Sequence, residues 1–411
     1  MAQLEQQVER VAGLDVHRDK VVACARLGYS QPEVKKKTFL TTTKGVDQLA
    51  RWLADLEVTR VVMESTGVYW KPVYYGLEGL FAELWLVNAR HVKNVPGRKT
   101  DMADAEWLAD VAAHGMVRPS LVPQPAAREL RELTRYRKTQ VTMRAQEVQR
   151  LDKLLQDAGI KISSVTSTVL GKSTRAMIDA LIAGERDPVV LANKALGRMR
   201  PKMAALSEAL VGRFAAHHAA VARAILGHID FLDANITALD QEVAARMEPF
   251  RAAVDLLVTI PGVGQTTAQV FIAETGGDMS RFPSAEHLAA WSGLAPANHE
   301  PAGKHKPVGT RQGATWLRRA LVESAKVASM SKANYLAAQY HQIAARRGPN
   351  KATVAVAHSI LVAAWHMLST GEVYDDLGDD WFRSRRDPER ETRRLVARLQ
   401  ALGHKVSLTA A

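Results

Sequence analysis

The stretch that decides the fold is Val11–Leu27, VAGLDVHRDKVVACARL, near the start of a chain of 411 residues. Two apolar runs, Val11–Val16 and Val21–Leu27, flank the polar tetrapeptide HRDK, a pattern typical of a β-hairpin. Lys37–Thr42 predicts a third strand. The chain therefore begins with strands that are neighbours in sequence, as in an antiparallel sheet.

Helices separate the strands that follow this hairpin. Lys44–Leu56 carries apolar residues at three- and four-residue spacing, which predicts a helix, and a second helix is predicted near Trp70–Gly79. Arg60–Met63 and Glu83–Val87 are predicted as buried strands. Hairpin strands followed by strands that alternate with helices indicate a mixed α/β sheet layer in roughly the first 120 residues.

The character of the sequence changes from Ala126 onward, after a linker containing Pro119, Pro123 and Pro125. The segments Ala126–Ala158 and Ala204–Met247 have apolar residues near heptad spacing. This spacing predicts two long helices that pair with each other or across a dimer, as in a coiled coil. A simple helical spacer within a monomer is the alternative interpretation.

Beyond Asp255 the pattern is helical with glycine-rich interruptions. The sequence IPGVG at Ile260–Gly264 has the form of a helix-hairpin-helix turn. The glycines of such a turn, Gly262 and Gly264, let backbone amides approach a phosphate at a helix N-terminus. An ordinary turn between two helices is the competing interpretation.

The overall charge favours a polyanionic partner. Lys and Arg number 55 against 43 Asp and Glu, a formal net charge of +12, which favours nucleic acid above all, with an anionic membrane as the rival. No apolar run approaches the roughly 18 to 20 residues of a membrane span, and the N-terminal MAQLEQQVER has no signal-peptide core. We therefore expect a cytoplasmic protein with no membrane partner. The single cysteine, Cys24, excludes an intramolecular disulfide and multi-cysteine zinc sites, and a packing role is expected for it.

Four carboxylates occupy positions that suit chemistry. Asp15 ends the first apolar run, and Glu64 directly follows a buried strand. Asp101 and Asp104 are three residues apart where a helix begins, so they share one helix face. Carboxylates that converge from strand ends and a facing helix repel one another and need a cation, and oxygen-only ligands indicate Mg²⁺ or Mn²⁺. Such a site suits phosphoryl chemistry on a phosphodiester.

Each carboxylate also has a simpler interpretation. Asp15 could only open a turn, Glu64 could only cap a helix, and the two later aspartates could only favour a helix N-terminus through the macrodipole. The set of four next to a basic stretch favours the metal site, because cations there would attract phosphate. That stretch contains Arg90, His91, Lys93, Arg98 and Lys99.

Four motifs together resemble a known family. They are GLDVHRD at 13–19, VVMESTGVYW at 61–70, VNARHVKNVPGRKTDMADAEWLA at 87–109 and GLAPANHEPAGKHKPVGTRQGATWLRRALVESA at 293–325. These segments resemble the DEDD insertion-sequence transposases, the RNA-guided bridge recombinases related to the Piv DNA invertase. The resemblance extends from about Val11 to Phe382 and is weakest in the central helices.

The resemblance implies an α/β plus all-α protein in four parts. It implies an RNase H-like catalytic domain similar to Holliday-junction resolvases at 1–125, a helical coiled-coil dimerisation region at 126–250, a helical transposase domain at 251–382 and a charged tail at 383–411. The catalytic, metal-binding tetrad falls on Asp15, Glu64, Asp101 and Asp104. Family members are expected to assemble as dimers or tetramers around an element-encoded guide RNA that pairs with donor and target DNA.

The sequence departs from the family at the nucleophile. A family serine in the context Glu-Ser-Ala-Gly-Lys attacks the DNA phosphate, whereas here Pro301 stands between Glu300 and Ala302. Proline has no hydroxyl and cannot form the covalent intermediate. Ser292 does not match the family position, and we expect it to be a packing or capping residue. The hypotheses are then a recombinase that uses another nucleophile, a resolvase-like nuclease that directs a metal-bound water at DNA, and a recombination-deficient copy that binds nucleic acid. A further hypothesis, which sets the resemblance aside, is a basic nucleic-acid-binding scaffold without a metal site.

Basic residues persist around the altered motif. They crowd a stretch with few acids that also contains Trp316, which favours a nucleic-acid surface over a merely solvated face. The nucleic-acid-binding residues predicted here are Lys304, Lys306, Arg311 and Arg318, together with Gly262 and Gly264 of the turn. His358, in an apolar helix, is predicted to be a core histidine and not a metal ligand.

Overall fold

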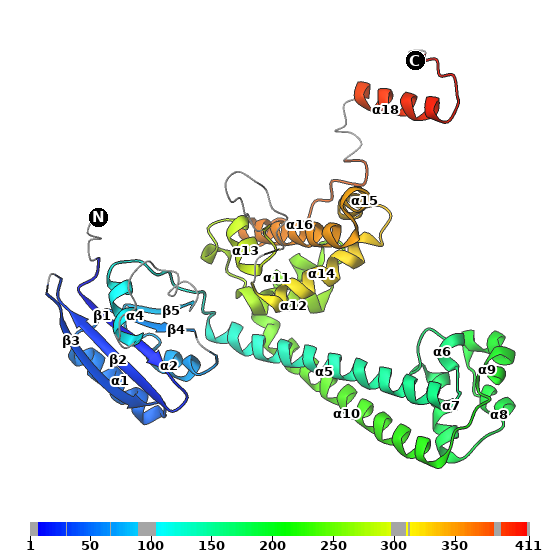
Figure 1. Ribbon diagram of the computed structural model, residues 1–411, viewed down its shortest axis with the longest axis horizontal. Helices are drawn as coiled ribbons and strands as arrows, with labels where there is room; N and C mark the ends of the chain where they lie inside the picture. Colours follow the sequence, from blue (N-terminus) through cyan, green and yellow to red (C-terminus); the bar gives the residue numbers. More distant parts are fainter. Residues whose placement is uncertain are drawn as a thin grey trace. The chain divides into compact units, whose positions relative to one another are not determined.

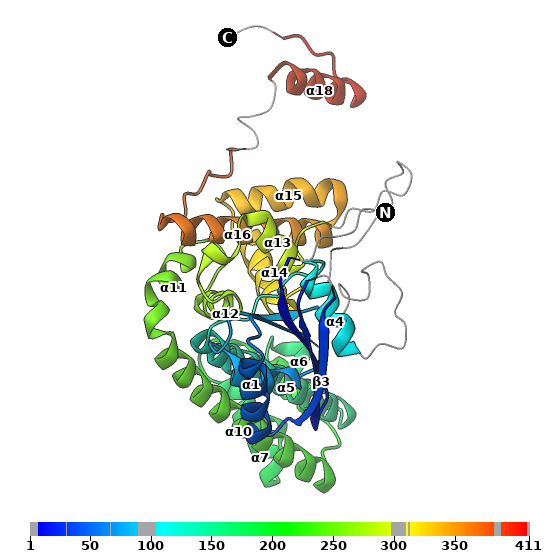
Figure 2. The ribbon, with the colours of Figure 1, turned by 90° about the vertical axis from the view of Figure 1, so that its left-hand side faces the viewer.

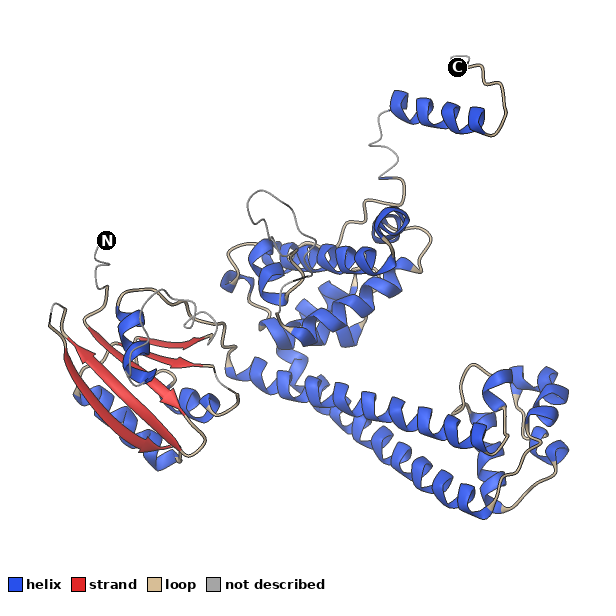
Figure 3. Ribbon diagram, in the orientation of Figure 1, coloured by secondary structure: helices blue, strands red, loops and turns tan. Residues whose placement is uncertain are grey.

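The computed structural model describes residues 7–29, 31–65, 67–88, 104–296, 310, 313–381 and 388–408. The chain divides into two compact units, Met1–Val122 and Pro123–Ala411 (Figure 1). Among the described residues, every strand lies in the first unit and the second unit is helical (Figure 3). The mixed α/β start and the helical remainder predicted from the sequence are confirmed.

The first unit is built on one five-stranded sheet. Its strands are β1 Arg10–Val16, β2 Lys20–Leu27, β3 Glu33–Leu40, β4 Arg60–Glu64 and β5 Glu83–Val87. They lie in the order β3-β2-β1-β4-β5, with β1, β2 and β3 antiparallel and with β4 parallel to both β1 and β5. The predicted hairpin is therefore β1 and β2. The third strand begins at Glu33, before the predicted Lys37, because an edge strand tolerates charged residues that mask the strand pattern.

The alternation of side chains along β1 separates two cores. Ala12 and Leu14 are buried with residues of α1 (Thr43–Asp55) and α2 (Trp70–Leu77). Val11 is buried with residues of α4 (Asp104–Ala113). Because successive strand side chains point to opposite faces, α1 and α4 cover opposite faces of the sheet (Figure 2).

Two long helices, α5 (Pro125–Asp157) and α10 (Ala216–Met247), pack along each other in the second unit. Ion pairs Arg137–Asp240 and Arg144–Asp233 show that the two helices run antiparallel. The connection between them folds into a cluster of short elements, whose apolar core includes residues from the adjoining ends of α5 and α10. These elements are α6 Ile162–Val165, α7 Lys172–Ala183, α8 Pro188–Ala192, the 3₁₀ segment Gly197–Lys202 and α9 Met203–Ala209.

The predicted helix Ala204–Met247 is interrupted between α9 and α10. Gly212 lies in this break, and a Cβ there would stand 2.5 Å from the carbonyl oxygen of Ala158. The chain thus turns against the C-terminal end of α5, a contact that heptad spacing does not reveal. The prediction of one continuous helix over this segment was wrong.

The C-terminal part is a cluster of helices around α16 (Pro349–Thr370), which packs against α11, α13, α14 and α15. The other elements are the 3₁₀ segments Glu248–Phe250 and Met279–Arg281, and the helices α11 Arg251–Val258, α12 Gln265–Thr275, α13 Ala285–Ser292, α14 Thr315–Ser329, α15 Tyr335–Arg347 and α18 Pro388–Ala401.

One described helix, α16, is long and apolar enough to cross a membrane by length and composition alone. The sequence prediction concerned an uninterrupted apolar run, and in α16 His358 and His366 interrupt the apolar sequence. Ile360 and Leu361 of α16 are fully buried. These contacts are those of a core helix within the cluster.

Candidate functional site

Two of the predicted carboxylates lie side by side at one end of the sheet. In the parallel pair β1 and β4, Leu14 is paired with Met63, so Asp15 and Glu64 follow at the next position of each strand. Both carboxylates are partly exposed. The adjacent strands therefore bring Asp15 and Glu64 to neighbouring positions at the carboxyl ends of β1 and β4.

Strand alternation also decides which face these two residues occupy. Gly13, two residues before Asp15, lies against α4, and Val62, two residues before Glu64, is buried in the same core as Leu108 of α4. Residues two apart on a strand share a face. Asp15 and Glu64 therefore lie on the face of the sheet that α4 covers.

The helix α4 brings a third carboxylate to this face. Asp104 is its first residue and is exposed, and a negative charge in the first turn is stabilised by the helix dipole. Ion pairs hold α4 to the strands: Arg26 of β2 with Asp110 at 3.4 Å, and Lys36 of β3 with Glu106. The fourth predicted carboxylate, Asp101, lies outside the described residues.

An imidazole contacts the first carboxylate. His17, in the turn after β1, places its Nε2 atom 3.1 Å from Oδ2 of Asp15. The side chain of Asp15 is 30% exposed and that of His17 is 51% exposed, so the pair faces solvent. In the part of the chain that the structure describes, no three His, Cys, Asp or Glu side chains are grouped closely enough to hold a metal ion. We call the face of the sheet that carries Asp15, Glu64 and Asp104 the acidic face. It supplies carboxylate oxygens, the ligands that Mg²⁺ and Mn²⁺ prefer, but the described side chains do not form a complete coordination shell.

The two glycines of the predicted phosphate-binding turn have different surroundings. Gly262 adopts φ +84°, and a Cβ there would stand 2.4 Å from the carbonyl oxygen of Ser324 in α14. Gly264 is the N-cap of α12, and among the described residues no neighbouring atom lies within 4 Å of such a Cβ. Close packing of the turn on α14 accounts for Gly262, and Gly264 alone borders open space.

Of the predicted basic residues, only Arg318 is described. It lies on α14 and lines a groove with Lys326 and Asn350. Pro301, Lys304, Lys306 and Arg311 lie outside the described residues. Ser292 is fully buried and its hydroxyl donates to the carbonyl of Ala289, so it is a packing residue, as predicted.

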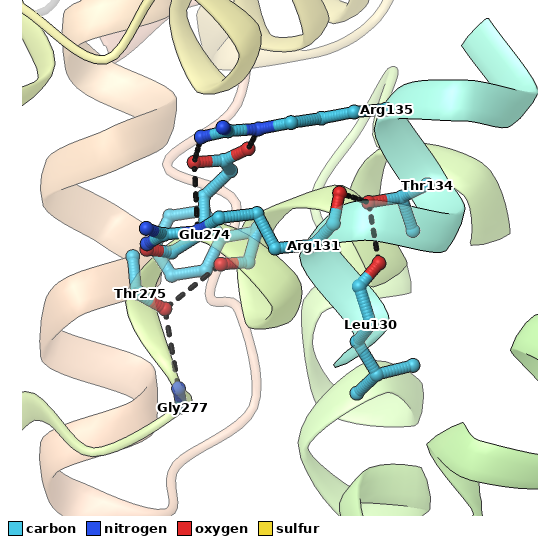
Figure 4. A network of polar contacts seen from close by, with 8 residues as sticks. Leu130, Arg131, Thr134, Arg135, Glu274, Thr275 and Gly277 are labelled. Atoms are coloured by element: carbon cyan, nitrogen blue, oxygen red, sulfur yellow. Dashed lines mark hydrogen bonds and ion pairs between the residues drawn. The ribbon is translucent and has the colours of Figure 1, made fainter. Parts of the chain in front are cut away.

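The structure also reveals a buried ion cluster that was not predicted. Glu274 of α12 is 1% exposed, and its two carboxylate oxygens accept hydrogen bonds from Nε and Nη2 of Arg135 at 2.7 and 2.8 Å. Arg131 forms an ion pair with the same carboxylate and donates to the Glu274 carbonyl (Figure 4). The sequence signal for this cluster was a glutamate within the apolar segment FIAET. Its partners Arg135 and Arg131 are 139 and 143 residues away along the chain.

His358 is half-buried in α16. Burial lowers the pKa of its imidazole, and the nearby carboxylate of Glu286 opposes that shift. The sequence prediction of a core histidine agrees with this environment.

Comparisons with known proteins point in one direction. A DEDD transposase model of the IS110 type matches residues 12–160, and a model described as transposase of the IS116/IS110/IS902 family matches residues 254–342. The two segments together make up more than half of the chain. The transposase for insertion sequence element IS1111A of Coxiella burnetii is 25% identical over 384 residues, which span 89% of this chain and 91% of that protein.

Shorter similarities agree with this result. The insertion element IS900 uncharacterized 42 kDa protein of Mycobacterium paratuberculosis is 31% identical over 219 residues, 48% of this chain and 53% of that protein. The pilin gene-inverting protein of Moraxella bovis is 39% identical over 80 residues, 19% of this chain and 24% of that protein.

Proposed function

Because the chain belongs to the DEDD transposase family of insertion sequences, we propose that it cuts and rejoins DNA at a divalent-metal carboxylate site in its first unit. The observation that carries this proposal is the shared face of Asp15, Glu64 and Asp104. The neighbouring strand ends that carry Asp15 and Glu64, and the start of a helix that covers the same face, support this proposal. The order of the five strands, with Asp15 on the central strand, supports an RNase H-like assignment for this unit.

The residues that would hold Mg²⁺ or Mn²⁺ are Asp15, Glu64, Asp101 and Asp104. Carboxylate oxygens are the ligands that these hard cations prefer. A bound divalent ion would stabilise negative charge on the phosphodiester oxygens. The contribution of the chain is positional: β1 and β4 carry Asp15 and Glu64, α4 begins with Asp104, and His17 contacts one oxygen of Asp15.

For the rest of the chain, we propose a division of roles by domain. Residues 1–125 form the catalytic domain, 126–250 a coiled-coil dimerisation region, 251–382 the transposase domain and 383–411 a tail. The ion pairs Arg137–Asp240 and Arg144–Asp233 support the coiled-coil assignment, because their members are seven residues apart on both helices. These ion pairs join two helices of one chain, and the formation of dimers or tetramers through this region is a separate part of the proposal.

We propose that the partners are DNA and an element-encoded guide RNA in the cytoplasm. The net charge of +12 supports a polyanionic partner. The nucleic-acid surface would include Gly264 and Arg318, together with Lys304, Lys306 and Arg311 of the basic stretch. Gly262 contributes to this surface only by fixing the turn on α14.

A second candidate function rests on Pro301. This position corresponds to the family's serine nucleophile, and proline offers no hydroxyl to attack phosphorus. On this account the chain is a recombination-deficient copy that binds nucleic acid. Replacing Pro301 by Ser would then restore strand transfer, whereas an unchanged lack of transfer in a folded, DNA-binding P301S variant would contradict it.

The experiment that tests the main proposal is Mn²⁺-dependent cleavage of DNA carrying the element's own ends, with the flanking non-coding RNA supplied. We expect cleavage by the wild-type chain and its loss in Asp104→Asn. The matched control is Asp47→Asn, since Asp47 is an exposed carboxylate of α1 on the opposite face of the sheet. Equal cleavage by wild type and the Asp104 variant would overturn the carboxylate site. A protein–DNA adduct would identify the nucleophile.

A further inference from the structure

A pocket in the second unit lies between α5, α12 and α14. None of its lining residues belongs to the acidic face described above. The side chains that give it chemical character are Arg135, Lys138, Thr266, Gln269, Trp316 and Arg319. The pocket thus combines one large aromatic ring with cations and neutral hydrogen-bonding groups.

Two flat surfaces in this pocket lie close together. The guanidinium of Arg135 is 5.8 Å from the centre of the Trp316 ring. The two hydrogen bonds to Glu274 fix the plane of that guanidinium. Arg135 therefore presents a fixed plane next to the ring of Trp316, and nucleobases stack on both indole rings and guanidinium planes.

The pocket wall from α12 supplies groups that could read the edge of a base. Gln269 carries an amide that both donates and accepts hydrogen bonds, and Thr266 carries a hydroxyl. Within the residues that the structure describes, neither side chain has a hydrogen-bond partner. Gln269 is half-buried, so a ligand in the pocket would satisfy an amide already partly removed from water.

The charges around the pocket favour an anionic ligand. Lys138 is paired with Glu323 at 2.9 Å, and Arg135 is paired with Glu274. Arg319 is exposed and forms no ion pair with any described residue. Its guanidinium is the cation left to contact a phosphate.

We propose that this pocket binds one unpaired nucleotide of a nucleic-acid strand. The base stacks against Trp316, its edge contacts Gln269, and its phosphate contacts Arg319. This inference rests on the proposed function, because it assumes that nucleic acid is the partner of the second unit. The inference adds that the second unit distinguishes unpaired strands from paired ones.

The test uses the full-length chain and fluorescence anisotropy with two labelled probes, a single-stranded DNA 12-mer and a fully paired duplex of the same sequence. We expect Trp316→Ala to weaken single-strand binding about 10- to 100-fold and to leave duplex binding within about twofold, because stacking needs an exposed base. Trp316→Phe, which keeps an aromatic ring, restores most of the affinity.

Free thymidine monophosphate as competitor distinguishes a site for a strand from a site for a mononucleotide. Competition by the mononucleotide below about 1 mM would overturn the strand assignment.

Arg319 provides a second, independent variant. Arg319→Ala should weaken single-strand binding more than Arg251→Ala, which removes the same charge from an exposed position of α11. Unchanged single-strand affinity in Trp316→Ala would overturn the pocket proposal, as would an equal loss on both probes in a folded variant. Wild-type binding to the duplex but not to the single strand would overturn this inference alone, whereas failure to bind any nucleic acid would overturn the proposed function as well.

Discussion

Gly13 in β1 lies so close to Ala105 in α4 that a Cβ on the glycine would stand 2.1 Å from the Ala105 carbonyl oxygen. The same Cβ would stand 2.6 Å from the amide nitrogen of Ala109. The helix therefore rests directly on the backbone of the central strand. Because Asp104 precedes Ala105 and Asp15 follows Gly13 by two residues, this contact sets the position of one carboxylate relative to the other.

We predict that Gly13→Ala moves α4 away from the sheet. The added methyl group meets backbone atoms that cannot shift alone, so we expect a loss of at least about 1 to 3 kcal/mol in the free energy of unfolding. Mn²⁺-dependent DNA cleavage should fall further than stability explains, because Asp104 moves with the helix. Urea unfolding and cleavage assays at a temperature where the variant is folded measure the two effects.

Gly227→Ala is the control for this glycine replacement. Gly227 lies within α10, and in the part of the chain that the structure describes no atom of another segment lies within 4 Å of the place that an alanine methyl group would take. Alanine is the better helix former, so we expect a gain of about 0.5 to 1 kcal/mol. A similar loss of stability in both variants would contradict the close contact at Gly13.

We predict that Glu274→Gln strongly destabilises the second unit. The change leaves the guanidinium groups of Arg131 and Arg135 without the buried carboxylate that neutralises them. Removing one partner of a buried ion pair costs about 3 to 5 kcal/mol, and we expect the lower value because the Arg135 side chain is 37% exposed. Urea unfolding measures the change.

Glu248→Gln provides the comparison, since Glu248 forms an exposed ion pair with Arg251. We expect it to change stability by no more than about 1 kcal/mol. Equal effects of the two glutamate replacements would show that the Glu274 cluster does not stabilise the fold.

We predict that the two glycines of the IPGVG turn respond differently to alanine. Gly262→Ala forces a side chain into the backbone of α14 at a positive φ, so the free energy of unfolding falls by more than about 1 kcal/mol, an order of magnitude set by strained φ and overpacking. Gly264→Ala meets open space and changes stability by less than about 1 kcal/mol.

DNA affinity measured on folded protein should fall in the Gly264 variant if α12 approaches phosphate. Wild-type affinity there would remove Gly264 from the nucleic-acid surface.

We predict that His358 makes the folded state less stable in mild acid. Its pKa is lowered in the folded chain by burial and is about 6.5 in the unfolded chain. Below about pH 6.5 the unfolded chain takes up a proton that the folded chain resists, so the free energy of unfolding falls as the pH falls. His358→Gln removes this contribution. The free energy of unfolding of this variant, relative to that of the wild type, should therefore rise as the pH is lowered from 8 to 5. Parallel pH profiles from urea unfolding would contradict the prediction.

The sequence predicted those strands and helices whose apolar pattern lies within a single segment. Strand alternation at Val11–Val16 placed Asp15 at the end of an apolar run, and the buried strand before Glu64 placed the second carboxylate. Heptad spacing predicted the two long helices. Each of these features is encoded within one element, so a single sequence is sufficient to find it.

Features that join distant segments could not be predicted in this way. The packing roles of Gly13, Gly212 and Gly262 depend on a backbone contributed by another element, and a glycine carries no sign of what approaches it. The Arg135–Glu274 pair joins residues 139 positions apart. Periodicity tells which face of a helix is buried, but not which partner covers it.

The pairing of α5 with α10 has a consequence for distance. A helix of 33 residues rises about 1.5 Å per residue, so α5 is about 50 Å long. The short helices α6 to α9 are attached at the end of this arm that is farther from α11 and α12. Stacked base pairs are about 3.4 Å apart, so the arm equals about fifteen base pairs of duplex. The helix pair therefore separates the groups that contact its two ends by about 50 Å.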